Sequence, residues 1–168
     1  DVHCHLDILK DISGVVEKAA RQRVNIIVAN GIDYKTNRKV LSFVKKFPSV
    51  RAALGIYPID ALKMSDKGLI EEIQFIKKHA NEILGIGEVG MDFKEGDEKK
   101  RQEEIFVKFI KLSKELDKPI IVHSRNAEEA CVDVLERAMA KKVVMHCFCG
   151  SKKLIRRIVE NGWMLSVP

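Results

Sequence analysis

Apolar residues along the chain fall into short continuous runs, which alternate with longer segments whose apolar positions recur every three or four residues. The runs place valine, isoleucine and leucine on consecutive positions, which is typical of parallel strands buried on both faces. Seven strand-like segments are predicted in this way: 1–7, 25–32, 50–57, 83–89, 119–124, 142–148 and 162–167.

The segments between these runs show the period of amphipathic helices that pack one face against a core. Ser13 and Ser65 are predicted to cap two of these helices, and Asn126 together with Glu129 is predicted to cap a third. Six helices are predicted, around residues 13–20, 40–47, 65–76, 105–116, 126–138 and 154–159.

Regular alternation of strands and helices predicts a parallel α/β sheet with right-handed crossovers. A doubly wound sheet and a (β/α)8 barrel both satisfy this pattern. No glycine-rich phosphate loop follows the first strand, which counts against a nucleotide-binding doubly wound fold. Polar residues at the ends of many different strands favour the barrel. We therefore expect one domain over residues 1–168, a TIM-type barrel of which this chain carries about seven strands.

The charge and the cysteine content indicate the kind of partner and the cellular compartment. The net charge of +6 favours an anionic partner such as nucleic acid, although a lysine-rich surface has the same composition. No apolar run approaches the roughly 18 residues of a membrane span, and the first residues already belong to a strand rather than a signal peptide. Four cysteines without a C-x-x-C pair suit a reducing cytoplasm. Cys147 and Cys149 remain open as a metal-binding pair.

Candidate chemistry begins at His3 and His5, which are two residues apart in the first predicted strand. Side chains alternate across a strand, so both imidazoles are expected on one face. Such a pair suits a divalent metal, but two histidines with ordinary hydrogen-bond partners would give the same pattern.

Glu88 lies near the end of the predicted strand over residues 83–89, in an apolar stretch rich in glycine. A carboxylate in such surroundings is costly unless it is paired or bound to a metal. The neighbouring glycines leave room for an ion or substrate beside the backbone. A ligand role is therefore favoured over a surface charge.

Two further strands end in histidine, at His123 and His146. Arg125 follows the first of them, where its guanidinium could bind a phosphate. Tyr57 ends an earlier strand and could offer its hydroxyl to the same phosphate or simply be an aromatic residue at the barrel rim. Four histidines and a glutamate at strand ends indicate one metal site.

The segments DVHCHLD, GIYP, IGEVGMDF, IIVHSRNA and HCFCGS resemble the TatD family of metal-dependent deoxyribonucleases, a branch of the amidohydrolase-like barrels. The resemblance implies two divalent ions, of zinc, manganese or magnesium. It assigns His3 and His5 to one ion, makes Glu88 the bridging catalytic residue, and assigns His123 and His146 to the second. It also implies hydrolysis of DNA phosphodiester bonds, often from the 3′ end, with single-stranded DNA or 3′ ends as partner and no obligate protein partner.

The sequence departs from the family pattern at two places that affect the site. Tyr57 stands where the family usually has histidine, and the family's final strand, which carries a metal-binding aspartate, has no counterpart before Pro168. We therefore expect the working protein to be longer by the last βα region. Two alternatives stay open: a hydrolase of a small molecule of the amidohydrolase or phosphotriesterase kind, and a non-catalytic remnant that binds nucleic acid.

Overall fold

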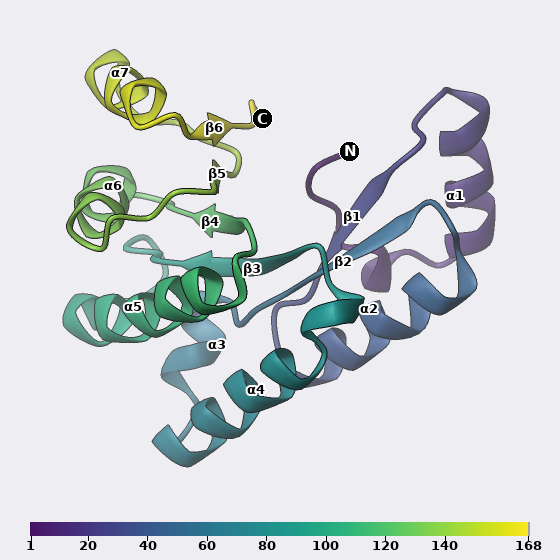
Figure 1. The fold of residues 1–168 in the computed structure, drawn as a ribbon, viewed down its shortest axis with the longest axis horizontal. Coiled ribbons are helices and arrows are strands. Elements are labelled where there is room, and N and C mark those ends of the chain that lie inside the picture. Colours follow the sequence, from purple (N-terminus) through teal and green to yellow (C-terminus); the bar gives the residue numbers. More distant parts are fainter. Residues whose placement is uncertain (168) are drawn as a thin grey trace.

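Six parallel strands form one sheet whose spatial order follows the sequence (Figure 1). The computed structural model describes residues 1–167. The sheet curls into part of a barrel, as expected for a (β/α)8 fold, and every strand pairs with the next one along the chain in parallel register. The strands are β1 (Ile27–Asn30), β2 (Val50–Leu54), β3 (Gly85–Gly90), β4 (Ile120–His123), β5 (Val143–Met145) and β6 (Met164–Leu165).

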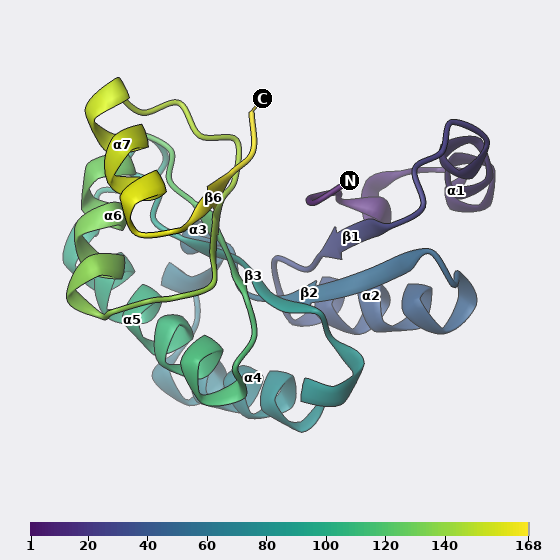
Figure 2. The ribbon, with the colours of Figure 1, turned by 45° about the horizontal axis from the view of Figure 1, so that its top comes forward.

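The helices cover the convex side of the sheet, and all six that the sequence predicts are present (Figure 2). One further short helix, α3, begins at Pro58, whose fixed φ suits the first helical turn. The α-helices are α1 (Ile12–Arg21), α2 (Tyr34–Lys46), α3 (Pro58–Leu62), α4 (Asp66–Lys78), α5 (Lys99–Leu116), α6 (Glu128–Arg137) and α7 (Lys152–Glu160), and the 3-10 turns are η1 (Leu6–Ile8) and η2 (Ala80–Glu82).

The strand predicted over residues 1–7, the first of the seven, is much shorter than expected. Only one residue of this segment, Cys4, forms a parallel bridge, to Ala29 of β1. The chain then turns into η1, whose first residue, Leu6, is fully buried in the main core, so this segment leaves the extended geometry of a strand. The bridge nevertheless holds His3 and His5 beside β1, so the site does not depend on a full strand here.

Two predicted caps are also wrong, and one is confirmed. Asp11, rather than Ser13, caps α1 by accepting a hydrogen bond from the backbone N–H of Gly14. Asn126 lies in the left-handed region with φ 52°, so it cannot serve as the extended cap of α6. Ser65 caps α4 as predicted, accepting from the N–H of Gly68.

The main core lies between the sheet and the outer helices. Phe106 and Phe109 of α5 are fully buried there against strand residues such as Ile86 and Ile120. A small separate cluster, made of Val28, Ala53 and Ile121 with Val144 against it, occupies alternate strand positions. Both faces of the central strands are therefore buried, as the apolar runs indicate. The polar side chains of these strands lie at or near the strand ends.

Within residues 1–167, no helix combines the length and the apolar character that a membrane crossing requires.

Candidate metal centre

The carboxyl ends of the strands bring the candidate ligands to one edge of the sheet. Cys4 donates its backbone N–H to Val28 and accepts from Asn30, which anchors His3 and His5 beside β1. Glu88 lies in β3, His123 ends β4, and His146 follows β5. Parallel strands present their carboxyl ends at the same rim, so these residues meet although they are far apart in sequence.

A local irregularity aims Glu88 at this rim. The register between β3 and β4 shifts between Ile86 and Val89, so the segment containing Glu88 bulges out of the regular ladder. The backbone N–H of Glu88 then donates to Gly31, 3.0 Å away, instead of to β4. Bulges commonly redirect one side chain in this way, and here the redirected group is the carboxylate.

The two oxygens of the Glu88 carboxylate face different imidazoles. Oε2 lies 3.2 Å from Nε2 of His3 and 3.2 Å from Nε2 of His5. Oε1 lies 2.8 Å from Nδ1 of His123. One carboxylate thus connects two sets of nitrogen donors, which is the arrangement of a ligand shared between two positions.

Glu88 is ionised although its side chain is only 5% exposed. Burial alone would raise its pKa, but the hydrogen bonds from His123, His3 and His5 outweigh burial and hold the pKa well below its usual range. In return, the hydrogen bond to Glu88 raises the pKa of His5. The site therefore presents a buried negative charge that is compensated only by the groups around it.

His146 lies against His3 with the two rings stacked, 3.5 Å between centroids and 10° between planes. Burial and the nearby His3 lower the pKa of His146 to about 4, so its ring is neutral at pH 7. Ligand atoms of His3, Glu88 and His146 lie within 4.8 Å of one another. This grouping places His146 with His3, whereas the resemblance pairs it with His123.

The donor set fits a divalent cation. Nε2 of His3 and Nε2 of His5 are 3.0 Å apart, and both are 3.2 Å from the same carboxylate oxygen. Donors bound at about 2.0–2.1 Å to a tetrahedral ion lie about 3.3 Å from one another, close to these separations. The buried Nδ1 of His3 has no hydrogen-bond partner among the described residues, so the ring makes its polar contacts through Nε2 alone. Imidazole and carboxylate together suit zinc, manganese and similar ions.

Asp92 belongs to the same site, and the sequence interpretation assigned it no role. Its Oδ2 atom accepts a hydrogen bond from the Tyr57 hydroxyl at 2.6 Å and lies 3.0 Å from Nε2 of His123. The signal that could have found Asp92 is its place two residues beyond the strand that carries Glu88. Tyr57 directs its hydroxyl hydrogen at Asp92, so contact with a phosphate would require that hydroxyl to change partner.

A cavity of about 430 Å³ opens over these residues. Arg125 lies at its mouth, about half exposed, in an ion pair with Glu95 at 2.8 Å. Cys147 and Cys149 are exposed free thiols that line the same cavity. The residues that line the cavity are His5, Tyr57, Glu88, His123, Ser124, Arg125, Glu128, His146, Cys147 and Cys149.

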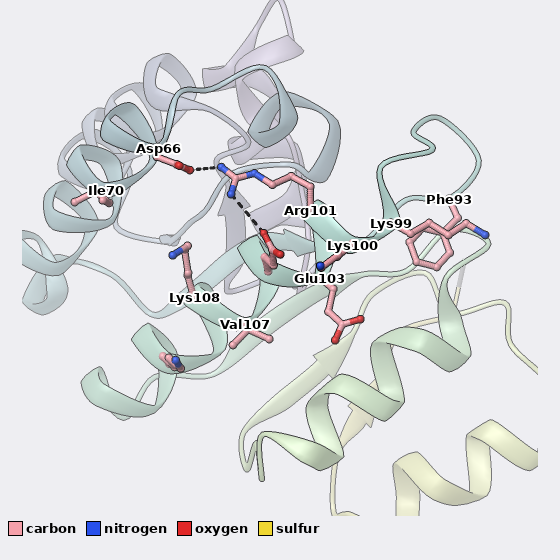
Figure 3. Close-up of a pocket in the computed structure, with 11 residues that line it drawn as sticks. Asp66, Ile70, Phe93, Lys99, Lys100, Arg101, Glu103, Val107 and Lys108 are labelled. Carbon is pink, nitrogen blue, oxygen red and sulfur yellow. Dashed lines mark hydrogen bonds and ion pairs between the residues drawn. The ribbon is translucent and has the colours of Figure 1, made fainter.

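A larger groove, of about 770 Å³, lies elsewhere, between α4 and α5 (Figure 3). Arg101 of α5 pairs across it with Asp66 of α4 and, on its own helix, with Glu104. Lys100 and Lys108 also line the groove. Its lining contains neither histidine nor cysteine. Size alone therefore does not locate the chemistry, and the smaller histidine-lined cavity is the candidate site.

Fold and site together define a parallel barrel-type α/β protein with a histidine- and carboxylate-rich cluster at its strand ends. The chain belongs to the family described as TatD related DNase, whose model matches residues 1–168. This confirms the family that the sequence motifs indicate.

Curated relatives carry names of the same kind. An uncharacterized metal-dependent hydrolase, MJ1582 of Methanocaldococcus jannaschii, is 36% identical over 99% of this chain and 66% of its own length. The human protein named deoxyribonuclease TATDN3 is 31% identical over 100% of this chain and 67% of its own length. The chain thus spans about two thirds of the length of the relatives it matches.

A solved structure supports the fold. The crystal structure of YjjV, a TatD homologue from Escherichia coli, matches 98% of this chain and 66% of its own, with a TM-score of 0.84 and 30% sequence identity. The curled six-stranded sheet of this chain therefore matches about two thirds of a TatD barrel structure.

Proposed function

We propose that this chain forms the metal-binding part of a hydrolase that depends on divalent ions and cleaves phosphodiester bonds of DNA. One observation carries the proposal: the two oxygens of the buried Glu88 carboxylate face separate sets of imidazole nitrogens, at 2.8 and 3.2 Å. The family and the name of the human relative, deoxyribonuclease, support DNA as the substrate.

We assign two divalent ions to this site, of zinc, manganese or magnesium. His3 and His5 would hold one ion, His123 and His146 would hold the second, and Glu88 would be the ligand shared by both. Ions bound there would activate a water molecule and neutralise charge on the phosphate. The chain's own part is to fix these donors in a buried position, where Glu88 supplies the negative charge that two neighbouring cations need.

Arg125 is the proposed contact to the substrate phosphate. Its guanidinium lies at the mouth of the cavity, and its partner Glu95 is itself about half exposed, so the pair can open at little cost. The guanidinium fork matches two phosphate oxygens. The net charge of +6 favours binding of a polyanion. We propose that the substrate is single-stranded DNA or the 3′ ends of DNA.

Hydrolysis of end-labelled single-stranded DNA tests the proposal. With manganese or magnesium present, we expect products that shorten from the 3′ end, and no products when a chelator is present. A phosphotriester and an N-acyl amino acid, offered separately, represent the small-molecule alternatives. Turnover of either small molecule without any cleavage of DNA would show that the assigned substrate class is wrong.

Arg125→Ala is expected to weaken binding of single-stranded DNA by about 3- to 10-fold, equally for different base sequences, because phosphate contacts carry no base information. The slope of log affinity against log salt should become shallower by about 0.7, the value for one lost phosphate contact on a single strand. Fluorescence anisotropy with labelled oligonucleotides at several salt concentrations measures both quantities.

Lys108→Ala is the matched control, since it removes one cation from the groove between α4 and α5 (Figure 3). It should change neither the affinity by more than about 2-fold nor the salt slope. Equal effects of the two substitutions would mean that DNA contacts the surface without preference for the candidate site.

A further inference from the structure

Asp92 is a fully buried carboxylate whose oxygens are all engaged. Its side chain is 0% exposed. Oδ1 accepts hydrogen bonds from the backbone N–H groups of Lys94 and Glu95, both at 2.9 Å. Oδ2 accepts from Tyr57 and faces His123. A buried carboxylate with so many partners is held in one orientation.

The backbone of Asp92 is fixed as well. Gln102 of α5, itself buried, accepts from the Asp92 N–H at 2.7 Å and donates to the Asp92 carbonyl at 2.9 Å. A helix of the outer layer thus clamps the residue that touches His123. This double contact to a main chain is what positions a side chain to within a fraction of an ångström.

His123 lies between two carboxylates, and each of its ring nitrogens faces one of them. Nε2 is 3.0 Å from Oδ2 of Asp92, and Nδ1 is 2.8 Å from Oε1 of Glu88. A metal-binding histidine usually donates its second ring N–H to a carboxylate, which fixes both tautomer and orientation. Asp92 can accept this hydrogen bond from Nε2 of His123, which leaves Nδ1 as the nitrogen free to bind an ion.

We infer that Asp92 is a positioning residue, which holds the hydrogen of His123 on Nε2 so that Nδ1 is the atom offered to a divalent ion beside Glu88. The inference rests on the metal site of the proposed function. Tyr57 serves the same purpose, because its hydroxyl occupies one lone pair of Oδ2 and its ring lies edge-on to the His123 ring, 4.8 Å between centroids. Tyr57 therefore supports the metal ligand instead of binding the phosphate.

Asp92→Asn tests this role with little change of shape. The N–H groups of Lys94 and Glu95 retain the side-chain carbonyl oxygen, so the new NH2 group faces Nε2 of His123 and donates to it. The ring hydrogen then moves to Nδ1, and the ligand atom is lost. We expect zinc affinity, measured by competition with a chelating dye, to fall by about 10- to 100-fold.

A second measurement reports the tautomer without any activity assay. In the zinc-loaded wild-type full chain, ¹⁵N–¹H correlation of the His123 ring should show the hydrogen on Nε2, and in Asp92→Asn this signal should be lost. Tyr57→Phe keeps Asp92 and should keep the Nε2–H form, with zinc affinity reduced less than 10-fold. Asp60→Asn removes a carboxylate from an exposed ion pair with Lys63 and should change neither readout.

The outcomes separate this inference from the proposed function. If wild type binds zinc but Asp92→Asn binds it equally well, the positioning role is wrong and the metal site stands. If wild type binds no divalent ion, both are wrong. Should Asp92→Asn fail to fold, the wild-type spectrum decides, because a zinc-bound His123 with its hydrogen on Nδ1 overturns the inference.

Discussion

Glu88→Gln is expected to lower the rate of DNA hydrolysis by about 1,000-fold or more, which corresponds to about 4 kcal/mol of activation free energy. The amide keeps the size of the side chain but removes the negative charge that lies between the imidazoles of His3, His5 and His123. Two cations bound close together would repel each other more strongly without that charge. Single-turnover rates at saturating manganese, together with bound metal after dialysis, measure the loss.

Glu103→Gln is the control for this substitution. It removes a carboxylate of the same size from an exposed ion pair with Arg137, far from the strand ends, so the rate should stay within about 2-fold of wild type. Retention of both metal ions and of a tenth or more of the wild-type rate by Glu88→Gln would contradict the bridging role of Glu88.

Gly90→Ala is expected to lower the free energy of unfolding by about 3 kcal/mol, because strain in the backbone adds to a steric clash. Gly90 has φ 143°, a conformation that side-chain-bearing residues avoid. A Cβ atom there would lie 2.0 Å from the backbone oxygen of His123. The close approach of β3 and β4 at this point also brings Glu88 to His123, so metal affinity should fall together with stability.

Gly162→Ala separates the two causes of that loss. Gly162 also has a positive φ, of 70°, but a Cβ atom there meets nothing within 4 Å. It should cost about 1 kcal/mol from backbone strain alone. Urea denaturation of both variants gives the comparison. Equal losses would show that the contact with His123 does not limit the packing of β3 against β4.

The strands could be predicted from the sequence because their burial on both faces leaves a signal in every position. Val28, Ala53 and Ile121 pack on one side of the sheet while their neighbours pack on the other, so the runs are mostly apolar, with single polar interruptions such as Arg51. The first segment carries no such run. Its single bridge through Cys4 depends on contact with β1, which no local pattern reveals.

The site residues also differ in whether the sequence alone could predict them. His3, His5, Glu88, His123 and His146 could be proposed together because parallel strands end at one rim. Asp92 and Gln102 could not, because their roles depend on how α5 packs beside β3 and on the turn that follows that strand. The stacking of His146 on His3 likewise depends on the curl of the sheet, which brings the start of the chain close to the end of β5.

Anomalous diffraction from crystals grown with zinc or manganese locates the ions bound at the strand ends. We expect two peaks there, about 3.5–4 Å apart, each in contact with a different oxygen of Glu88. One peak should lie against Nε2 of His3 and His5, and the other against Nδ1 of His123. A rim without anomalous signal, or ions that leave Glu88 uncoordinated, would show that Glu88 does not bridge two metal ions.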